Sequence, residues 1–326
     1  MMRERMSDTL QRTGRVVRTD AKVCHVETEG QVLACVPRGR LFEERTEQKN
    51  PIAVGDLVRI DTTSQPPSLD EVLPRRNRLG RTASSHDPRE QVLIANVDQL
   101  CIVASVEKPK FSSNRTDRIL GAALWYDVPA LLVLNKVDLD RDGSTEAIAR
   151  TYENIGVDVL RTSVTTGLGV EELRARLKDR VTALYGASGV GKSSLLNALQ
   201  PGLKLKVGKI SKFWDGGKHT TSFSQLHRLE FGGWVADTPG IRTFRLHKAD
   251  PAALRGMFPE FARYQGACRF PDCSHDHEPG CEVFEAVERG DVAASRFASY
   301  VDLLDELRSA RPVEDAEPGA EPDGDE

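Results

Sequence analysis

The sequence has no hydrophobic run long enough to cross a membrane. Its longest apolar segment, residues 128–134, is far shorter than the about 20 residues that a spanning helix needs. It also has no apolar stretch near its start that resembles a secretory leader. Cys24, Cys35 and Cys101 are scattered among apolar neighbours, which is not the pattern of a disulfide framework. We therefore expect a cytoplasmic protein with no membrane segment.

The composition is sufficient for a multi-domain globular protein. With 326 residues, of which 39% are hydrophobic and 29% charged, the chain has room for two or three domains. The formal charge of -4 depends on the last thirteen residues, which carry no Lys or Arg and seven acids: Glu314, Asp315, Glu317, Glu321, Asp323, Asp325 and Glu326. The rest of the chain is mildly basic, which fits an anionic partner but is too small an excess to establish one. We expect residues 312–326 to be disordered.

The remaining cysteines form one compact group with a histidine. The spacing Cys268-x4-Cys273-x-His275-x5-Cys281 places three thiolates and one imidazole within fourteen residues. Such a set suits a closed tetrahedral zinc site with no open position, so we expect one structural rather than catalytic Zn²⁺. The spacing leaves His277 open as an alternative ligand, and reduced cysteines without a metal are the other alternative.

Hydropathy patterns divide the chain into three parts. Short alternating runs from residue 14 to about 73 predict a small antiparallel β-barrel of about five strands. Strand and helix patterns alternate from about residue 94, which indicates a mostly parallel sheet with helices on both faces. After residue 250 we expect helices around the cysteine-rich loop. Between barrel and sheet, residues 74–81 contain four arginines, which form either a solvated linker or a phosphate contact.

A phosphate-binding loop precedes a predicted helix. The pattern G-x-x-x-x-G-K-[ST] follows a short apolar strand and is formed by Gly186, Ala187, Ser188, Gly189, Val190, Gly191, Lys192 and Ser193. Its glycines let backbone N–H groups, continuing to Ser194, converge on phosphate oxygens at the start of the helix. We expect Lys192 to reach the β- and γ-phosphates and Ser193 to ligate Mg²⁺.

A guanine-reading motif comes earlier in the chain. The string N-K-x-D follows another predicted strand and consists of Asn135, Lys136, Val137 and Asp138. In GTPases its aspartate accepts hydrogen bonds from guanine and rejects adenine. Ser163 and Val164 follow a further predicted strand and resemble the weaker S-A-[KL] element behind the base, although Val164 replaces the usual alanine.

Two more elements complete a GTPase set in an unusual order. Asp237 to Gly240 form a D-x-x-G element, in which Asp237 would hold Mg²⁺ through water and the Gly240 N–H would sense the γ-phosphate. Before it lie Thr220 and Thr221, one of which could complete the Mg²⁺ shell. Because ordinary GTPases begin with the phosphate loop, this order predicts a circularly permuted domain.

Together these motifs resemble the ribosome small-subunit-dependent GTPase A family, the circularly permuted bacterial GTPases of late 30S maturation. The resemblance covers roughly residues 14–308 and implies that GTP hydrolysis to GDP is slow alone, is stimulated by the 30S subunit and releases the factor. It also implies that His219 helps to position the attacking water. The residue after Gly240 is Ile241, which cannot orient water as a glutamine does there, so catalysis must be completed elsewhere.

The resemblance implies three domains and a set of partners. The implied domains are an OB-fold β-barrel and linker (14–92), a circularly permuted P-loop GTPase domain (93–248) and an α-helical zinc-binding domain (249–311). Outside the resemblance we expect a flexible N-terminus (1–13) and the acidic tail (312–326), which makes five parts in all. The resemblance further implies contacts with 16S rRNA and small-subunit proteins, by a monomer.

Three rival functions remain open on the sequence. One is an ATP-using P-loop protein or small-molecule kinase, which the N-K-V-D string disfavours. Another is an RNA-binding module that guanine nucleotide regulates, with little intrinsic hydrolysis. The third is a protein adaptor built on the zinc loop.

Overall fold

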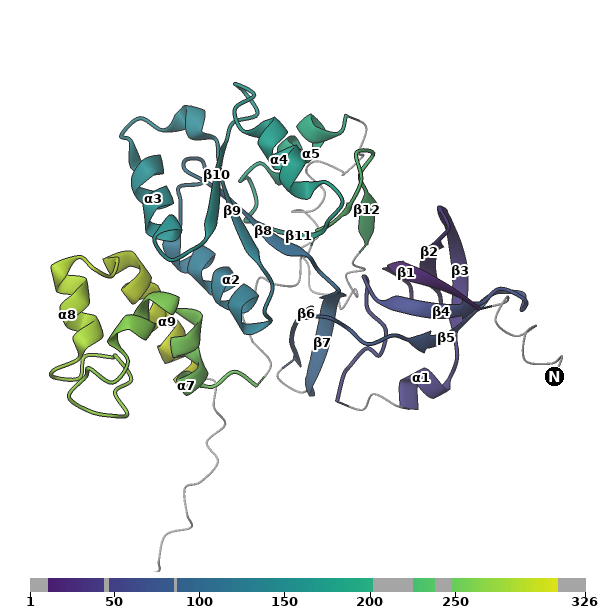
Figure 1. The fold of residues 1–326 in the computed structure, drawn as a ribbon, viewed down its shortest axis with the longest axis horizontal. Coiled ribbons are helices and arrows are strands. Elements are labelled where there is room, and N and C mark those ends of the chain that lie inside the picture. Colours follow the sequence, from purple (N-terminus) through teal and green to yellow (C-terminus); the bar gives the residue numbers. More distant parts are fainter. Residues whose placement is uncertain (1–10, 44–46, 85–86, 202–224, 238–247, 310–326) are drawn as a thin grey trace, which may run out of the picture. The chain divides into compact units, whose positions relative to one another are not determined.

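The computed structural model describes residues 11–43, 47–84, 87–201, 225–237 and 248–309. Its residues group into two compact units, Met1–Lys248 and Ala249–Glu326 (Figure 1). Across the described residues, no helix has both the length and the apolar character that crossing a membrane requires.

The N-terminal part of the first unit is a closed five-stranded barrel, as expected. Its strands follow the order β1-β2-β3-β5-β4: β1 (Gln11–Thr19), β2 (Cys24–Thr28), β3 (Gln31–Pro37), β4 (Leu57–Asp61) and β5 (Ser68–Val72). A short helix, α1 (Arg40–Glu43), follows β3. Alternate residues of β2 are buried, which is the period-2 pattern that the sequence showed. The prediction of a wholly antiparallel barrel was wrong at one seam, because β3 and β5 pair in parallel.

The arginine-rich stretch is part of the folded structure rather than a solvated linker. It leads into a two-stranded ribbon, β6 (Arg78–Ser84) and β7 (Asp87–Ala95), that the sequence did not predict. Three of its arginines form ion pairs: Arg75 with Asp56, Arg76 with Asp98, and Arg78 with Glu90. The first pair is buried, with side chains 7% and 0% exposed. Arg75 and Arg76 join the start of the ribbon to the segments just before β4 and β8 (Gln99–Ser105), and Arg78 joins the two strands of the ribbon.

The expected α/β domain is a six-stranded sheet covered by helices on both faces (Figure 1). The strand order is β10-β9-β8-β11-β13-β12: β8 (Gln99–Ser105), β9 (Ala130–Asn135), β10 (Asp158–Thr162), β11 (Val181–Tyr185), β12 (Leu226–Arg228) and β13 (Trp234–Asp237). All neighbours are parallel except β12 and β13. One core cluster packs under α2 (Ser113–Trp125) and α3 (Ser144–Glu153). The other packs under α4 (Val170–Leu177) and α5 (Lys192–Leu199).

The barrel has a core cluster of its own and also contributes residues to one of the two clusters of the sheet. Val17 and Val54 of the barrel belong to the same buried cluster as the residues under α2 and α3. Arg18 of β1 forms an isolated antiparallel bridge with Gln225, next to the edge strand β12. Gly55 has φ of 91°, and a Cβ there would lie 2.1 Å from the Ala95 carbonyl oxygen, so only glycine allows this close approach.

The second unit is helical, as expected. Residues 251–264 form α7 (Pro251–Leu254) and two 3₁₀ turns, η3 (Arg255–Met257) and η4 (Pro259–Tyr264). Pro259 separates η3 from η4, because a proline disfavours helical geometry in the residue before it. Phe258 accordingly has φ of -122° and ψ of 81°. The helices α8 (Glu282–Arg289) and α9 (Ala294–Ser309) follow the cysteine loop, as predicted.

Candidate functional site

The phosphate loop connects β11 to α5, and its glycines are required by close contacts. A Cβ on Gly186 would lie 2.5 Å from the Val103 carbonyl oxygen, and one on Gly191 would lie 2.3 Å from Asn135 Nδ2. Gly191 also has φ of 100° and caps the helix that begins at Lys192. The Lys192 ammonium donates hydrogen bonds to the Gly186 carbonyl at 2.5 Å and the Ala187 carbonyl at 3.3 Å. The backbone of the phosphate loop therefore curves around the Lys192 side chain.

The N-K-V-D segment ends β9 directly beside this loop. Asn135 is 2% exposed, and its Nδ2 donates to the Val190 carbonyl at 2.8 Å. Its Oδ1 accepts from the Thr162 hydroxyl at 3.0 Å. Lys136 Nζ donates to the Gly189 carbonyl at 2.6 Å. Carboxyl ends of parallel strands meet at one edge of a sheet, which is why residues so far apart in sequence contact here.

The Asp138 carboxylate is oriented by a residue of the segment 163–165, which follows β10. Ser163 is fully buried, and its hydroxyl donates to Asp138 Oδ1 at 2.5 Å. The Thr166 N–H in turn donates to the Ser163 hydroxyl at 3.2 Å, which fixes that hydroxyl. Asp138 itself is exposed, and Val164 is 38% exposed. A carboxylate held at one oxygen and open to solvent is suited to accept hydrogen bonds from a ligand.

The four predicted zinc ligands lie together in the second unit. Ligand atoms of Cys268, Cys273, His275 and Cys281 all lie within 4.8 Å of one another. His275 Nδ1 is 3.6 Å from Cys268 Sγ and 3.5 Å from Cys281 Sγ. In a tetrahedral site with Zn–S of about 2.3 Å and Zn–N of about 2.0–2.1 Å, the sulfur and nitrogen would be about 3.5 Å apart. The donor set therefore fits zinc, and its four members leave no open position.

The electrostatics of the cluster also favour a cation. Burial and the neighbouring Cys281 and Cys268 thiols raise the pKa of Cys273 to about 12. Burial lowers the pKa of His275, which keeps the imidazole neutral, the form that ligates metals. Thiolates crowded into a buried site are costly without a positive ion, and Zn²⁺ would supply that charge.

The loop around the cluster is held by groups outside it. His277, the alternative ligand, is not part of the cluster, because its exposed ring hydrogen-bonds the Asp276 carboxylate at 2.6 Å. Burial alone would raise the pKa of Glu278. Hydrogen bonds from the Ser274 hydroxyl and nearby backbone N–H groups outweigh this and lower it to about 2. The Tyr300 hydroxyl of α9 donates to the Ser274 carbonyl at 2.6 Å, which ties the loop to the helix.

Comparison with known proteins decides the family. The RsgA GTPase family model matches residues 72–247. A small ribosomal subunit biogenesis GTPase RsgA from Gemmatimonas aurantiaca is 40% identical over 303 residues, covering 92% of this chain and 98% of the relative. The chain belongs to the RsgA GTPase family.

Two solved structures are similar to this RsgA GTPase over most of its length. YjeQ from Thermotoga maritima is 36% identical with a TM-score of 0.74, covering 93% of this chain and all of that chain. YloQ, described as a circularly permuted GTPase, is 30% identical with a TM-score of 0.68, covering 93% and 96%. The permuted order is visible in the sheet, where β9 with the N-K-V-D segment precedes β11 with the phosphate loop.

Several predicted site residues cannot be placed. His219, Thr220, Thr221 and Gly240 lie outside the described residues. Asp237 ends β13 in register with Leu184 of β11, which brings its backbone to the same sheet edge as the phosphate loop. In α5, Ser193 is half-buried and Ser194 is exposed. The roles of these residues therefore stay predictions.

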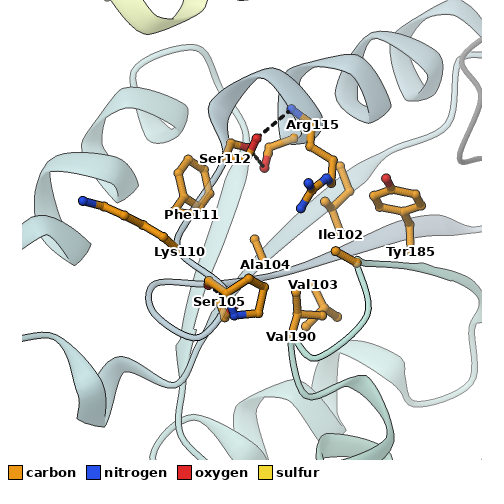
Figure 2. Close-up of a pocket in the computed structure, with 13 residues that line it drawn as sticks. Ile102, Val103, Ala104, Ser105, Lys110, Phe111, Ser112, Arg115, Tyr185 and Val190 are labelled. Atoms are coloured by element: carbon orange, nitrogen blue, oxygen red, sulfur yellow. Dashed lines mark hydrogen bonds between the residues drawn. The ribbon is translucent and has the colours of Figure 1, made fainter. Parts of the chain in front are cut away.

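Sequence reasoning missed one segment of the site, the turn that connects β8 to α2. It forms a wall of a small pocket beside the phosphate loop (Figure 2). Arg115 extends from α2 toward this pocket, whereas Lys110 points away from it. The pocket is also lined by Ala187 and Val190 of the phosphate loop and by Tyr185 of β11. No motif marks this turn, because its contacts are made largely by backbone carbonyls.

Proposed function

We propose that this RsgA GTPase binds the small (30S) ribosomal subunit in the cytoplasm and acts in its late maturation. Hydrolysis of GTP to GDP would be stimulated by the subunit and coupled to release of the factor. The observation that carries this proposal is the near full-length similarity to relatives named small ribosomal subunit biogenesis GTPase RsgA. The barrel, the permuted domain and the zinc-binding domain would contact 16S rRNA and small-subunit proteins, with the protein acting as a monomer.

The geometry supports a specific assignment of roles in GTP binding. Backbone N–H groups between Ser188 and Ser194 would surround the phosphates, and Lys192 would contact the β- and γ-phosphates. Asn135, Lys136 and Asp138 would bind guanine, with Val137, Ser163 and Val164 supporting that pocket. Mg²⁺ would be held by Ser193 and Thr221, with Asp237 acting through water, and would neutralise charge that develops on the phosphates.

Catalysis is expected to be incomplete in the isolated protein. Ile241 has no group that can orient the attacking water, so a residue elsewhere must do it. We propose His219 or a group from the ribosomal subunit for this role. In the sequence, Gly240 adjoins Ile241 and Thr220 adjoins His219. A ribosomal group that acts beside these residues would therefore act next to the expected γ-phosphate contacts. Slow hydrolysis alone would also suit the rival function, an RNA-binding module that guanine nucleotide regulates.

Asp138→Asn is expected to change nucleotide preference from GTP toward xanthosine triphosphate. The carboxylate offers two acceptors, one already used by Ser163, whereas an amide presents a donor to the base. We expect the ratio of the two affinities to change by at least about tenfold in competition titrations. Glu172→Gln, an exposed carboxylate in α4, serves as control. An unaltered preference for GTP in Asp138→Asn would show that this segment does not read guanine.

Co-sedimentation with purified ribosomal subunits tests the partner directly. With a non-hydrolysable GTP analogue, the protein should pellet with small subunits and not with large ones. With GDP it should remain in the supernatant. Equal sedimentation with both subunits, or none with either, would contradict a specific small-subunit partner. Binding to the small subunit that is identical in both nucleotide states would favour the rival RNA-binding function.

A further inference from the structure

The turn after β8 is fixed to the central sheet by a buried hydroxyl. Ser105 ends β8 opposite Asn135 in the parallel register and is 2% exposed. Its hydroxyl donates a hydrogen bond of 2.6 Å to the Pro109 carbonyl. The Val106 N–H donates to the Asn135 carbonyl at 3.1 Å, so the start of the turn is bound to the guanine-reading segment. The Ser105 hydroxyl therefore fixes the Pro109 end of a turn whose other end is held by Asn135.

The same turn contacts both halves of the nucleotide site. Lys136 Nζ donates to the carbonyl of Lys108 within the turn and to the carbonyl of Gly189 in the phosphate loop. Pro109 Cδ lies 3.5 Å from the place that a Cβ on Gly189 would take. One ammonium group thus joins the turn, the N-K-V-D segment and the phosphate loop.

We propose that Ser105 is a positioning residue for nucleotide binding, which acts through the turn and the Lys136 ammonium. A lysine side chain is flexible, and fixed acceptors on two sides reduce the entropy that it loses when a ligand binds. Without the Ser105 hydroxyl, the Pro109 carbonyl loses its buried donor and the Lys108 carbonyl is held less firmly. The inference rests on the proposed guanine site.

Ser105→Ala is expected to raise the Kd for GDP and for GTP by about 3- to 10-fold, the loss typical of one hydrogen bond. The kcat at saturating GTP should not change, because no reacting atom is touched. Thr151→Val is the matched control, because the Thr151 hydroxyl in α3 also donates to a backbone carbonyl, that of Ala147 at 3.0 Å, but does not line the pocket. It should bind nucleotide as the parent does. Thermal unfolding of both variants shows whether they remain folded.

A double-mutant cycle distinguishes positioning from a general loss of structure. In a Lys136→Met background the route from the turn to the nucleotide is absent, so Ser105→Ala should change the Kd by less than about 1.5-fold. An equal factor in both backgrounds would overturn the proposal, because a merely structural effect does not depend on Lys136. So would an unchanged Kd for Ser105→Ala alone.

The single variant Lys136→Met distinguishes a wrong role for Ser105 from a wrong assignment of the guanine site. If Lys136→Met binds GDP as tightly as the parent, the guanine site itself is misassigned. If Lys136→Met weakens binding and Ser105→Ala does not, the guanine site stands and only the role of Ser105 is wrong.

Discussion

Lys192→Ala is expected to weaken GTP and GDP binding by at least about 100-fold, which removes hydrolysis at ordinary substrate concentrations. The ammonium lies inside the phosphate loop, where it contacts the Gly186 and Ala187 carbonyls. Charge-assisted hydrogen bonds contribute about 1.5–3 kcal/mol each, and every 1.4 kcal/mol is a tenfold change in affinity. Loss of two contacts to phosphates gives the expected factor. Titration with a fluorescent guanine nucleotide measures it.

The control for this variant is a lysine in the same domain with no role in the loop. Lys178 follows α4 and is exposed, so Lys178→Ala should bind nucleotide as the parent does. Both variants should have unfolding temperatures close to that of the parent. Unchanged affinity of folded Lys192→Ala would show that residues 186–193 do not hold the phosphates.

Removal of the metal is expected to unfold the second unit while the first remains folded. Structural zinc contributes about 10–16 kcal/mol of apparent binding free energy in small zinc domains, which is comparable to or above the stability of a typical domain. His275 packs against Phe261 of η4 and Tyr300 of α9, so the cluster joins the cysteine loop to both of these elements. Chelation, or Cys273→Ser, should therefore abolish the cooperative transition of residues 249–309. Calorimetry and metal analysis of the intact chain measure both effects.

His277→Ala is the matched control, since this exposed ring lies two residues from a ligand but outside the cluster. It should keep one zinc ion per chain and the stability of the parent. Full thermal stability of the metal-free protein would contradict a structural metal. Loss of zinc from His277→Ala would show that the ligand set has been misassigned.

The close contacts of the loop glycines and the Cys3His cluster could be predicted because each has a steric or chemical reason to occur at a fixed spacing. Gly191 must lack a side chain where Asn135 contacts the loop. Cys273 and His275 must lie close enough to share one ion. Such requirements restrict residue type directly, so they are visible in a sequence. The alternation of strand and helix was visible for the same reason, since burial on a sheet restricts polarity.

The missed features depend on contacts that do not restrict residue type. The turn at Lys108 and Pro109 acts through backbone carbonyls, which every residue possesses. The residues next to Arg75 in the sequence give no sign that it forms a buried ion pair, because only the fold brings Asp56 close to it. The breaks within the helical residues 251–264 depend on backbone geometry, such as the non-helical conformation of Phe258 before Pro259.

GTP hydrolysis at low ionic strength, with and without purified small ribosomal subunits, tests the central claim most directly. Large subunits serve as the control, and Lys192→Ala gives the background rate. We predict strong stimulation by small subunits alone, because the isolated protein has Ile241 where a water-orienting residue would stand. Equal rates with small subunits, with large subunits and with neither would contradict a hydrolase that the small subunit activates.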